Sequence, residues 1–265
     1  MTINQFDSEI QAAIRAAIAA TDEILDVYVN DFDTIIKSDG SPVTEADYRS
    51  SQIIEEFLAP TKIPIIGEEM KNRDFKERKD WHKCWVIDPV DGTREFVNRN
   101  DEFAINIALV VDEKPVFGLI ASPVEHYMMF GGKEMGLFQA FYTNASPDIE
   151  EIDKGESESS DSIVVLTSRS HDSGMITDYL DNLESEYGEL TYLRKGSALK
   201  FIDLVKQKAH SYPRFAPTME WDIAAGQALL EAAGGTVLNA ETGLPLTYNK
   251  PNLYNPFFVA ENLPG

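Results

Sequence analysis

Two stretches near the N-terminus carry apolar residues at the spacing of a helix. Across residues 7–29, isoleucine, leucine and alanine recur at near-helical intervals, which predicts a long amphipathic helix. A second helix is predicted from Thr44 to about Leu58. Between the two helices, residues 34–38 favour a short strand, and residues 39–42 have the composition of a turn.

The middle of the chain has the pattern of a sheet. Residues 63–67 and 84–87 are short apolar runs, which favour buried strands. We expect the second of these strands to stop at Asp88-Pro89. From Phe103 to about Tyr142, β-rich segments alternate with Gly and Pro breaks, which is typical of a meander.

The C-terminal part alternates between strand and helix patterns. Strands are predicted near 163–166, 190–193, 210–213, 237 and 257–260, and helices near 173–183, 197–206 and 220–233. Gly234-Gly235 favours the end of the last helix. The whole pattern predicts a mixed α/β protein in which helices are layered on sheets.

An acidic segment offers the best internal boundary. Residues 148–161 are dominated by Asp, Glu and Ser, which predicts a solvated loop without a chemical role. We therefore expect an N-terminal α+β half over residues 1–147 and a C-terminal α/β half over residues 162–265.

Charge limits the partners that this chain can bind. It has 265 residues, 45 of them acidic and 23 basic, and a formal net charge of −22. Such a field repels polyanions, which argues against nucleic acid or an anionic membrane as a partner. A small anionic substrate is repelled as well, so cations have to neutralise any site that binds one.

The compartment is expected to be the cytoplasm. The single cysteine, Cys84, excludes an intrachain disulfide and suits a reducing environment. The N-terminal residues lack a signal-peptide pattern, and no apolar run approaches the length of a membrane span. Peripheral membrane association and the choice between monomer and homodimer stay open.

The segment Asp88-Pro89-Val90-Asp91-Gly92-Thr93 is the clearest candidate for chemistry. A strand that ends here aims both carboxylates out of its carboxyl end, where α/β-type sheets place ligands. Gly92 and Thr93 then offer N–H groups and a hydroxyl to an anion at the following helix start. Mg²⁺ prefers hard oxygen ligands and shares them with phosphate, so this pattern favours Mg²⁺-assisted phosphoryl chemistry. A simple turn after a strand explains the segment equally well on its own.

Further acidic residues are candidates to join this pair. Glu68 ends the strand expected to lie beside the Asp88 strand, while Glu69 is interpreted as a more distant or solvent carboxylate. Asp222 lies in the first turn of a predicted helix, where the macrodipole alone favours it. Asp47 fits a capping box at the start of another helix. Taken one at a time, each is more often structural than functional.

Four motifs occur in the order and spacing of the inositol monophosphatase-like superfamily. They are Asp39-Gly40-Ser41-Pro42-Val43-Thr44-Glu45-Ala46-Asp47, Gly67-Glu68-Glu69, Asp88-Pro89-Val90-Asp91-Gly92-Thr93 and Trp221-Asp222-Ile223-Ala224-Ala225-Gly226. Within this superfamily, the chain resembles the CysQ-type 3′(2′),5′-bisphosphate nucleotidases. The segments that point there are Arg94-Glu95-Phe96, Ser168-Arg169-Ser170-His171, Gly196-Ser197-Ala198-Leu199-Lys200-Phe201 and Tyr212-Pro213-Arg214-Phe215. The resemblance runs from about residue 7 to the C-terminus, with Ala198 in place of a frequent Ser as a small departure.

The resemblance implies a fold and a set of metal ligands. The implied fold is α/β (α+β), a layered αβαβα sandwich of the inositol monophosphatase and fructose-bisphosphatase type. Two or three Mg²⁺ ions are implied at Glu68, Asp88, Asp91, Asp222 and the Val90 carbonyl, which stands where Ile or Leu is common. Glu68, Asp91 and Asp222 are implied to contact substrate as well. Such ions would reverse the repulsion among the carboxylates, polarise phosphoryl oxygens and lower the pKa of a bound water.

The resemblance also implies how water attacks the phosphate. Thr93, hydrogen-bonded to Asp47, is implied to orient and deprotonate a water for in-line attack. The N–H groups of Gly92 and Thr93 are implied to hold phosphate oxygens. No covalent phosphoenzyme is required, and Cys84, inside an apolar strand, is interpreted as a core residue.

Specificity is implied to come from the C-terminal half. His171 is a candidate to stack on or hydrogen-bond an adenine, and a surface histidine at a helix start is the alternative. Ser197, Lys200 and Arg214 are candidates to contact the nucleotide and its non-reacting phosphate. Solvated basic side chains are the alternative for Lys200 and Arg214.

The resulting hypothesis is hydrolysis of adenosine 3′,5′-bisphosphate to AMP and phosphate, which clears a by-product of sulfate assimilation. The sulfated nucleotide is a second candidate substrate, and inhibition by Li⁺ and Ca²⁺ is implied. An inositol or sugar phosphatase is the alternative enzyme, because the metal motifs are shared. A nucleotide or metal sensor without turnover is less favoured, because Asp47 and Thr93 are both present and a binding protein would not need them for catalysis.

Overall fold

The computed structural model describes residues 1–38, 40–143, 146–152, 162–167 and 174–264. Its helices are α1 (Ser8–Val29), α2 (Glu45–Leu58), α3 (Phe75–Arg78), α4 (Thr93–Val97), α5 (Gly174–Tyr187), α6 (Leu199–Val205) and α7 (Glu220–Ala233). Its strands are β1 (Thr34–Ile36), β2 (Pro42–Thr44), β3 (Ile65–Gly67), β4 (Lys83–Asp91), β5 (Ala104–Val111), β6 (Lys114–Ser122), β7 (Tyr127–Gly132), β8 (Gly136–Phe141), β9 (Asp148–Glu151), β10 (Ile163–Thr167), β11 (Leu190–Arg194), β12 (Ser211–Arg214), β13 (Thr236–Asn239) and β14 (Phe258–Glu261).

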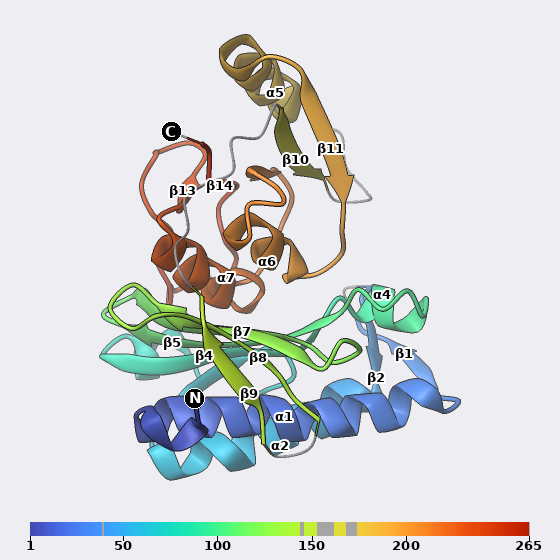
Figure 1. Ribbon diagram of the computed structural model, residues 1–265. Helices are drawn as coiled ribbons and strands as arrows, with labels where there is room; N and C mark the ends of the chain where they lie inside the picture. The colour runs from blue at the N-terminus through green and yellow to red at the C-terminus, as the bar shows by residue number, and fades with distance from the viewer. Residues whose placement is uncertain (39, 144–145, 153–161, 168–173, 265) are drawn as a thin grey trace.

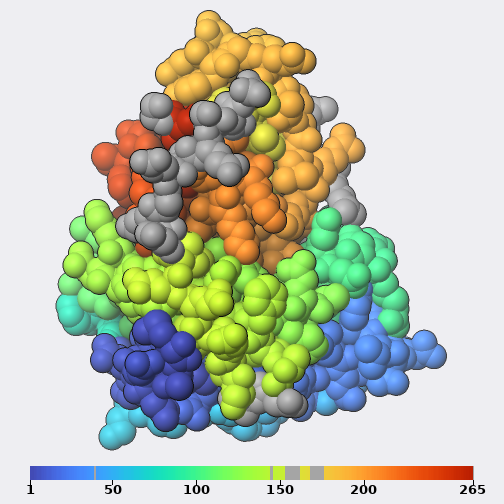
Figure 2. Space-filling model, viewed as in Figure 1, coloured from blue at the N-terminus to red at the C-terminus, as the bar shows by residue number. Residues whose placement is uncertain are grey.

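These elements form five layers, which Figure 1 shows from bottom to top. Helices α1 and α2 lie under a sheet of β3 to β9, and α6 and α7 lie between this sheet and a second one. The second sheet has the order β11-β10-β12-β14-β13, and α5 lies beyond it. In Figure 2 the segments coloured blue to green fill the lower part of the view, and orange to red segments fill the upper part. The predicted αβαβα sandwich is therefore confirmed.

The larger sheet has the predicted meander. Its strands follow the chain from β3 to β9, and every neighbouring pair after the parallel β3–β4 pair is antiparallel. One face packs on α1 and α2, whose isoleucines and alanines are buried, and the other face packs on α7. Because both faces are covered, β4 and β5 have near-continuous buried runs in place of alternation.

The prediction that the strand stops at Asp88 is wrong. Strand β4 continues to Asp91, with a shift in its pairing to β5: Asp88 pairs with Asn106 and Asp91 with Ala104. Three steps on β4 therefore oppose two steps on β5, so that β4 contains one extra residue, a β-bulge. Side chains three positions apart in a regular strand point to opposite faces, and the extra residue brings Asp88 and Asp91 to the same face.

The prediction of a loop over residues 148–161 is also wrong at its start. Residues Asp148–Glu151 form β9, which pairs with β8 and buries the side chain of Ile149 against the sheet. One apolar side chain facing the core and three exposed acidic ones satisfy the period of an edge strand. The rest of the acidic segment, residues 153–161, lies outside the described residues.

Helix α7 packs at very short range against the larger sheet and against helix α6. A Cβ added to Gly118 of β6 would lie 2.1 Å from the carbonyl oxygen of Ala225 in α7. A Cβ added to Gly226 would lie 2.2 Å from the ring of Phe201 in α6. Only glycine permits these approaches, so the position of α7 is fixed by sterics.

Among the described residues, no helix combines the length and apolar character needed to cross a bilayer.

We expect Gly118→Ala to lower the free energy of unfolding by about 1–3 kcal/mol, because the added methyl group pushes α7 away from the sheet. Urea unfolding followed by circular dichroism measures this. Val116→Thr, in the same strand but 45% exposed, is the matched control and should unfold like the wild type. Equal midpoints for Gly118→Ala and the wild type would show that α7 has more freedom than the packing indicates.

Candidate active site

Three carboxylates from distant segments meet at one end of the larger sheet. Glu68 follows β3, Asp88 lies in β4, and Asp222 lies in the first turn of α7. One oxygen of each lies within 4.8 Å of one oxygen of the others. The chain thus brings together three of the four carboxylates that the resemblance implied as metal ligands.

Asp91, the fourth of these carboxylates, is tied to the C-terminal half. Its Oδ2 accepts a hydrogen bond from the main-chain N–H of Ala198. Burial raises the pKa of Asp91 to about 6, although the Lys200 ammonium and the Ala198 N–H act in the opposite direction. One carboxylate therefore joins the acidic cluster to the turn between β11 and α6.

Burial and mutual repulsion raise the pKa of the central carboxyls. Asp88 is 2% exposed, and its pKa is raised well above the usual range by burial and then by Glu68 and Asp91. Burial and the charge of Asp91 raise the pKa of Asp222 in the same way. A cluster of hard oxygen ligands that repel one another fits a divalent cation, which would relieve that repulsion.

The two carboxylate oxygens of Asp47 have different partners, one at a helix start and one at the site. Its Oδ2 accepts hydrogen bonds from the N–H of Thr44 at 2.8 Å and from the Thr44 hydroxyl at 2.7 Å, as in the predicted capping box. Its Oδ1 lies 3.1 Å from the hydroxyl of Thr93, which is 3.2 Å from the carbonyl oxygen of Val90. Burial raises the pKa of Asp47, although these hydrogen bonds lower it. Asp47 is thus a helix cap and a partner of Thr93 at once.

Asp222 also has a structural partner. Its Oδ2 accepts a hydrogen bond of 2.7 Å from the N–H of Met219, at the start of α7. The next carboxylate, Glu220, is fully buried and accepts from the N–H of Asn249 at 2.6 Å and from the Lys250 ammonium at 2.6 Å. These bonds fix the first turn of α7, and with it the direction of the Asp222 side chain.

Lys37 is a site residue that the sequence reasoning missed. Its Nζ lies 2.9 Å from Glu68 Oε1 and also contacts Glu69. Burial lowers the pKa of Lys37, but the two carboxylates raise it by more. Glu69, which the sequence pattern indicated as a distant or solvent carboxylate, instead contacts the Lys37 ammonium next to the cluster. Only the position of Lys37 before the predicted turn could have drawn attention to it.

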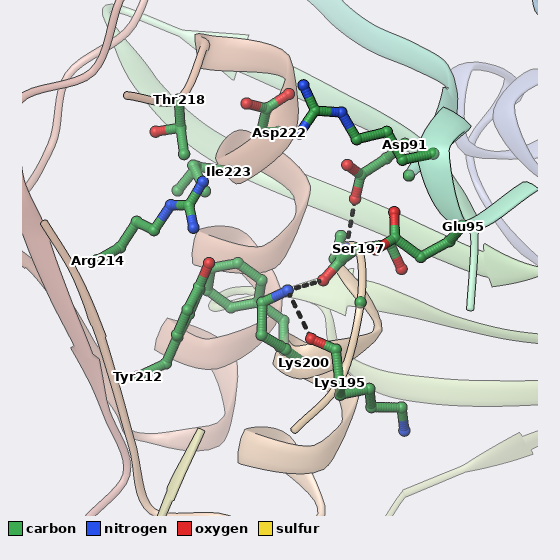
Figure 3. Close-up of a pocket in the computed structure, with 15 residues that line it drawn as sticks. Asp91, Glu95, Lys195, Ser197, Lys200, Tyr212, Arg214, Thr218, Asp222 and Ile223 are labelled. Carbon is green, nitrogen blue, oxygen red and sulfur yellow. Dashed lines mark hydrogen bonds between the residues drawn. The ribbon is translucent and has the colours of Figure 1, made fainter. Parts of the chain in front are cut away.

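A cavity of about 210 Å³ opens beside Asp91 and Asp222, and Figure 3 shows its lining. Gly92 lines it in the left-handed conformation at φ +92°, together with Ser197, Lys200 and Arg214. The guanidinium of Arg214 points into this space, and its buried Nε has no hydrogen-bond partner among the described residues. His171, the predicted adenine contact, lies outside the described residues.

Comparison with known proteins shows the family to which this chain belongs. The chain matches the profile of the inositol monophosphatase family over residues 6–257, and it belongs to that family. It is 35% identical over 252 residues to a protein of Shigella flexneri named 3′(2′),5′-bisphosphate nucleotidase CysQ. The aligned residues cover 90% of this chain and 94% of the relative. A protein of Salmonella typhimurium with the same name is 34% identical over 261 residues, 94% of this chain and 98% of the relative.

Solved structures agree with this membership. CysQ from Bacteroides thetaiotaomicron, a bacterial member of the inositol monophosphatase family, has a TM-score of 0.83 at 35% identity, over 94% of this chain and 95% of that one. The extragenic suppressor protein suhB from Bartonella henselae has a TM-score of 0.74 at 23% identity, over 97% and 94% of the two chains, which shows the fold alone. The family is metal-dependent, and the acidic cluster supplies suitable oxygen ligands.

We expect the metal-free protein to lose stability as the pH rises through about 6. The Asp91 carboxyl has a pKa of 3.8 as a free group and about 6 when folded, so the folded state holds its proton more tightly between these values. Its contribution to stability is fully present below the lower value and is lost as the pH rises through the upper one. Melting temperatures in excess chelator, compared between the wild type and Asp91→Asn, measure it.

The two pH profiles should diverge, with the wild type losing more than Asp91→Asn between about pH 4 and pH 6. Adding Mg²⁺ should reduce the loss in the wild type, because a cation favours the ionised carboxylates. Parallel profiles would contradict the upward shift of the Asp91 pKa.

Proposed function

We propose that this chain is an Mg²⁺-dependent 3′(2′),5′-bisphosphate nucleotidase that removes the 3′-phosphate of adenosine 3′,5′-bisphosphate to give AMP and phosphate. The observation that carries the proposal is the position of an acidic cluster beside a cavity into which Arg214 brings an Nε–H donor without a partner in the described part of the chain. The acidic cluster offers oxygen ligands to the metal ions that would bind the reacting phosphate. The guanidinium offers hydrogen-bond donors to a second anionic group. Similarity to relatives named CysQ supports the same substrate class.

The metal ligands proposed are the carboxylates of Glu68, Asp88, Asp91 and Asp222 with the carbonyl of Val90. Two or three Mg²⁺ ions held there supply charge neutralisation and Lewis-acid activation of phosphate and water. Asp88 and Asp91 face the same side because of the β4 bulge, so both are available to such a site. Glu68, Asp91 and Asp222 thereby also contribute to holding the substrate.

The proposed proton path uses Thr93 and Asp47. The Thr93 hydroxyl orients the attacking water and takes a hydrogen bond from it, while Asp47 Oδ1, 3.1 Å from that hydroxyl, receives the proton. The second oxygen of Asp47 is bound by the helix start and keeps the side chain in place. The N–H groups of Gly92 and Thr93 hold phosphate oxygens during in-line displacement.

The second phosphate is assigned to Arg214, because its buried Nε–H lacks a partner among the described residues. Ser197 and His171 are proposed to contact the nucleoside, and Lys200 lies at the same cavity. The sulfated nucleotide is a further proposed substrate. We place the enzyme in the cytoplasm, as a monomer or homodimer.

The first test is phosphate release with Mg²⁺ from adenosine 3′,5′-bisphosphate, inositol 1-phosphate and fructose 1,6-bisphosphate at matched concentrations. We expect the nucleotide to be preferred and chelator to abolish release, because the carboxylates alone repel the substrate. Preference for inositol or sugar phosphate would retain the metal site and reject the nucleotide assignment. No release from any of the three would favour a sensor, and full activity in chelator would reject the metal mechanism.

We expect Asp47→Asn to reduce kcat by about 10²- to 10⁴-fold while substrate still binds, because the proton acceptor is lost. Steady-state kinetics and calorimetric titration with substrate separate the two effects. Thr44→Val is the matched control: it removes one hydrogen bond of the cap, lowers stability by about 1 kcal/mol and should leave most of kcat. Loss of binding together with turnover in Asp47→Asn would show that Asp47 acts mainly as the cap.

A further inference from the structure

Arg78 is a buried guanidinium that joins two distant segments of the chain. It lies at the end of α3, is 3% exposed, and donates from each of its three nitrogens to an oxygen. Nε donates to the Arg73 carbonyl at 3.2 Å, Nη1 to Asn249 Oδ1 at 2.8 Å, and Nη2 to the Pro251 carbonyl at 3.2 Å. The Asn249 amide returns the contact, because its Nδ2 donates to the Arg78 carbonyl at 2.8 Å. Arg78 thus binds α3 to the loop between β13 and β14.

The same loop is bound to the start of α7. The N–H of Asn249 donates to Glu220 Oε2 at 2.6 Å, and the ammonium and N–H of Lys250 donate to Glu220 Oε1 at 2.6 Å and 3.0 Å. Asn255 Nδ2 donates to the Met219 carbonyl at 2.6 Å. Glu220 is fully buried, so one loop occupies both oxygens of a carboxylate that water does not reach. These contacts fix the first turn of α7.

Asn249 is the residue at which the two sets of contacts meet. Its φ is +57°, in the left-handed region that asparagine enters more easily than most residues. In this conformation its main-chain N–H binds Glu220 while its side-chain amide binds Arg78. Asn249 therefore connects α7 to α3 through three hydrogen bonds of 2.6 Å, 2.8 Å and 2.8 Å.

The other end of this network reaches the segment that carries Glu68. Asn72 closes a short loop on Gly67: its Oδ1 accepts from the Gly67 N–H at 3.0 Å, and its Nδ2 donates to the Gly67 carbonyl at 2.7 Å. Arg73 follows directly, and its carbonyl is one of the three acceptors of Arg78. Glu68 therefore lies in a loop whose end is held by a buried guanidinium.

Buried charges are a costly way to hold segments together. Replacing a buried ion pair by apolar residues is often neutral or stabilising, so stability alone does not explain why Arg78 and Glu220 are buried. A fully bonded polar network, in contrast, fixes one relative position of the elements that it joins. The elements joined here carry Glu68 and Asp222, whose carboxylate oxygens lie within 4.8 Å of each other.

We propose that this network, the Arg78–Asn249–Glu220 clamp, positions two metal ligands. It holds the segment of Glu68 against the first turn of α7, which carries Asp222, at the spacing that one cation needs. The clamp consists of positioning residues, because it acts through the segments that carry the two carboxylates. The inference rests on the proposed function for the identity of the metal, and on the hydrogen bonds of the clamp for its geometry.

The test measures Mg²⁺ binding by calorimetry, without substrate, in Arg78→Met, Glu220→Gln and the double variant. Methionine keeps much of the bulk of Arg78 without its donors, and glutamine keeps the shape of Glu220 without its charge. We expect each single variant to weaken Mg²⁺ binding by about tenfold, because changes that disturb the orientation of metal ligands have effects of this order. The double variant should bind about as weakly as the weaker single variant, because both changes break the same clamp.

Tyr248→Phe is the matched control. It removes a buried hydrogen bond of 2.6 Å to Gln227 from the same loop and keeps the ring that the Lys250 ammonium contacts. We expect its melting temperature in chelator to fall, as in the clamp variants, while its Mg²⁺ affinity stays at the wild-type value. Calorimetry is run well below the lowest melting temperature, so that a loss of stability alone does not weaken binding.

If Arg78→Met does not fold, Arg78→Lys replaces it: an ammonium keeps the charge but lacks the planar fork that reaches three acceptors, so Mg²⁺ binding should still weaken. Unchanged Mg²⁺ binding in the folded clamp variants, an equal loss in Tyr248→Phe, or a double variant whose loss is the product of the two single losses would overturn the proposal. A wild type that binds no Mg²⁺ would reject the proposed function and the clamp together. A wild type that binds Mg²⁺ but releases no phosphate would reject the reaction alone, and calorimetry would still decide the role of the clamp.

Discussion

Repulsion among carboxylates at the end of the larger sheet, where it meets the first turn of α7, is the constraint on which the rest of the structure depends. Glu68, Asp88 and Asp222 place oxygens within 4.8 Å of one another, and the charge of Asp91 adds to the effects that raise the pKa values of Asp88 and Asp222. Charges at this spacing interact strongly where water is excluded. Such a cluster persists because each member is held by neighbours: Ala198 binds Asp91, and Met219 binds Asp222.

Helix α7 brings the carboxylate of Asp222 to those of the larger sheet. It packs on both sheets, and glycines at 118 and 226 let it approach main-chain and ring atoms more closely than any other residue would permit. Its first turn carries Asp222 and is fixed by the buried Glu220 contacts to Asn249 and Lys250. Close packing fixes the centre of this helix, and charged hydrogen bonds fix its start. The Asp222 carboxylate is therefore placed with little freedom.

Local patterns were sufficient for much of this structure, because periodicity and capping act over a few residues. The capping box of Asp47, the long first helix and the meander could all be predicted from such patterns. The β4 bulge could not, since it depends on how β5 pairs across the sheet. The contact of Lys37 with Glu68 and the hydrogen bond from the Ala198 N–H to Asp91 are equally non-local, because they join segments whose approach only the completed fold decides.

The net charge of −22 makes the few cations at the site decisive. At physiological salt the screening length is about 8 Å, so distant surface acids contribute little inside the cavity and nearby groups set the potential. Lys37 lies against Glu68, Lys200 donates to two carbonyls, and the Nε–H of Arg214 has no partner among the residues that the structure describes. Three basic residues near one site thus differ in the partners that they already have, although composition and motif alone would treat them alike. The donors that each side chain has already committed to the protein set how much of its hydrogen-bonding capacity is left for a bound anion.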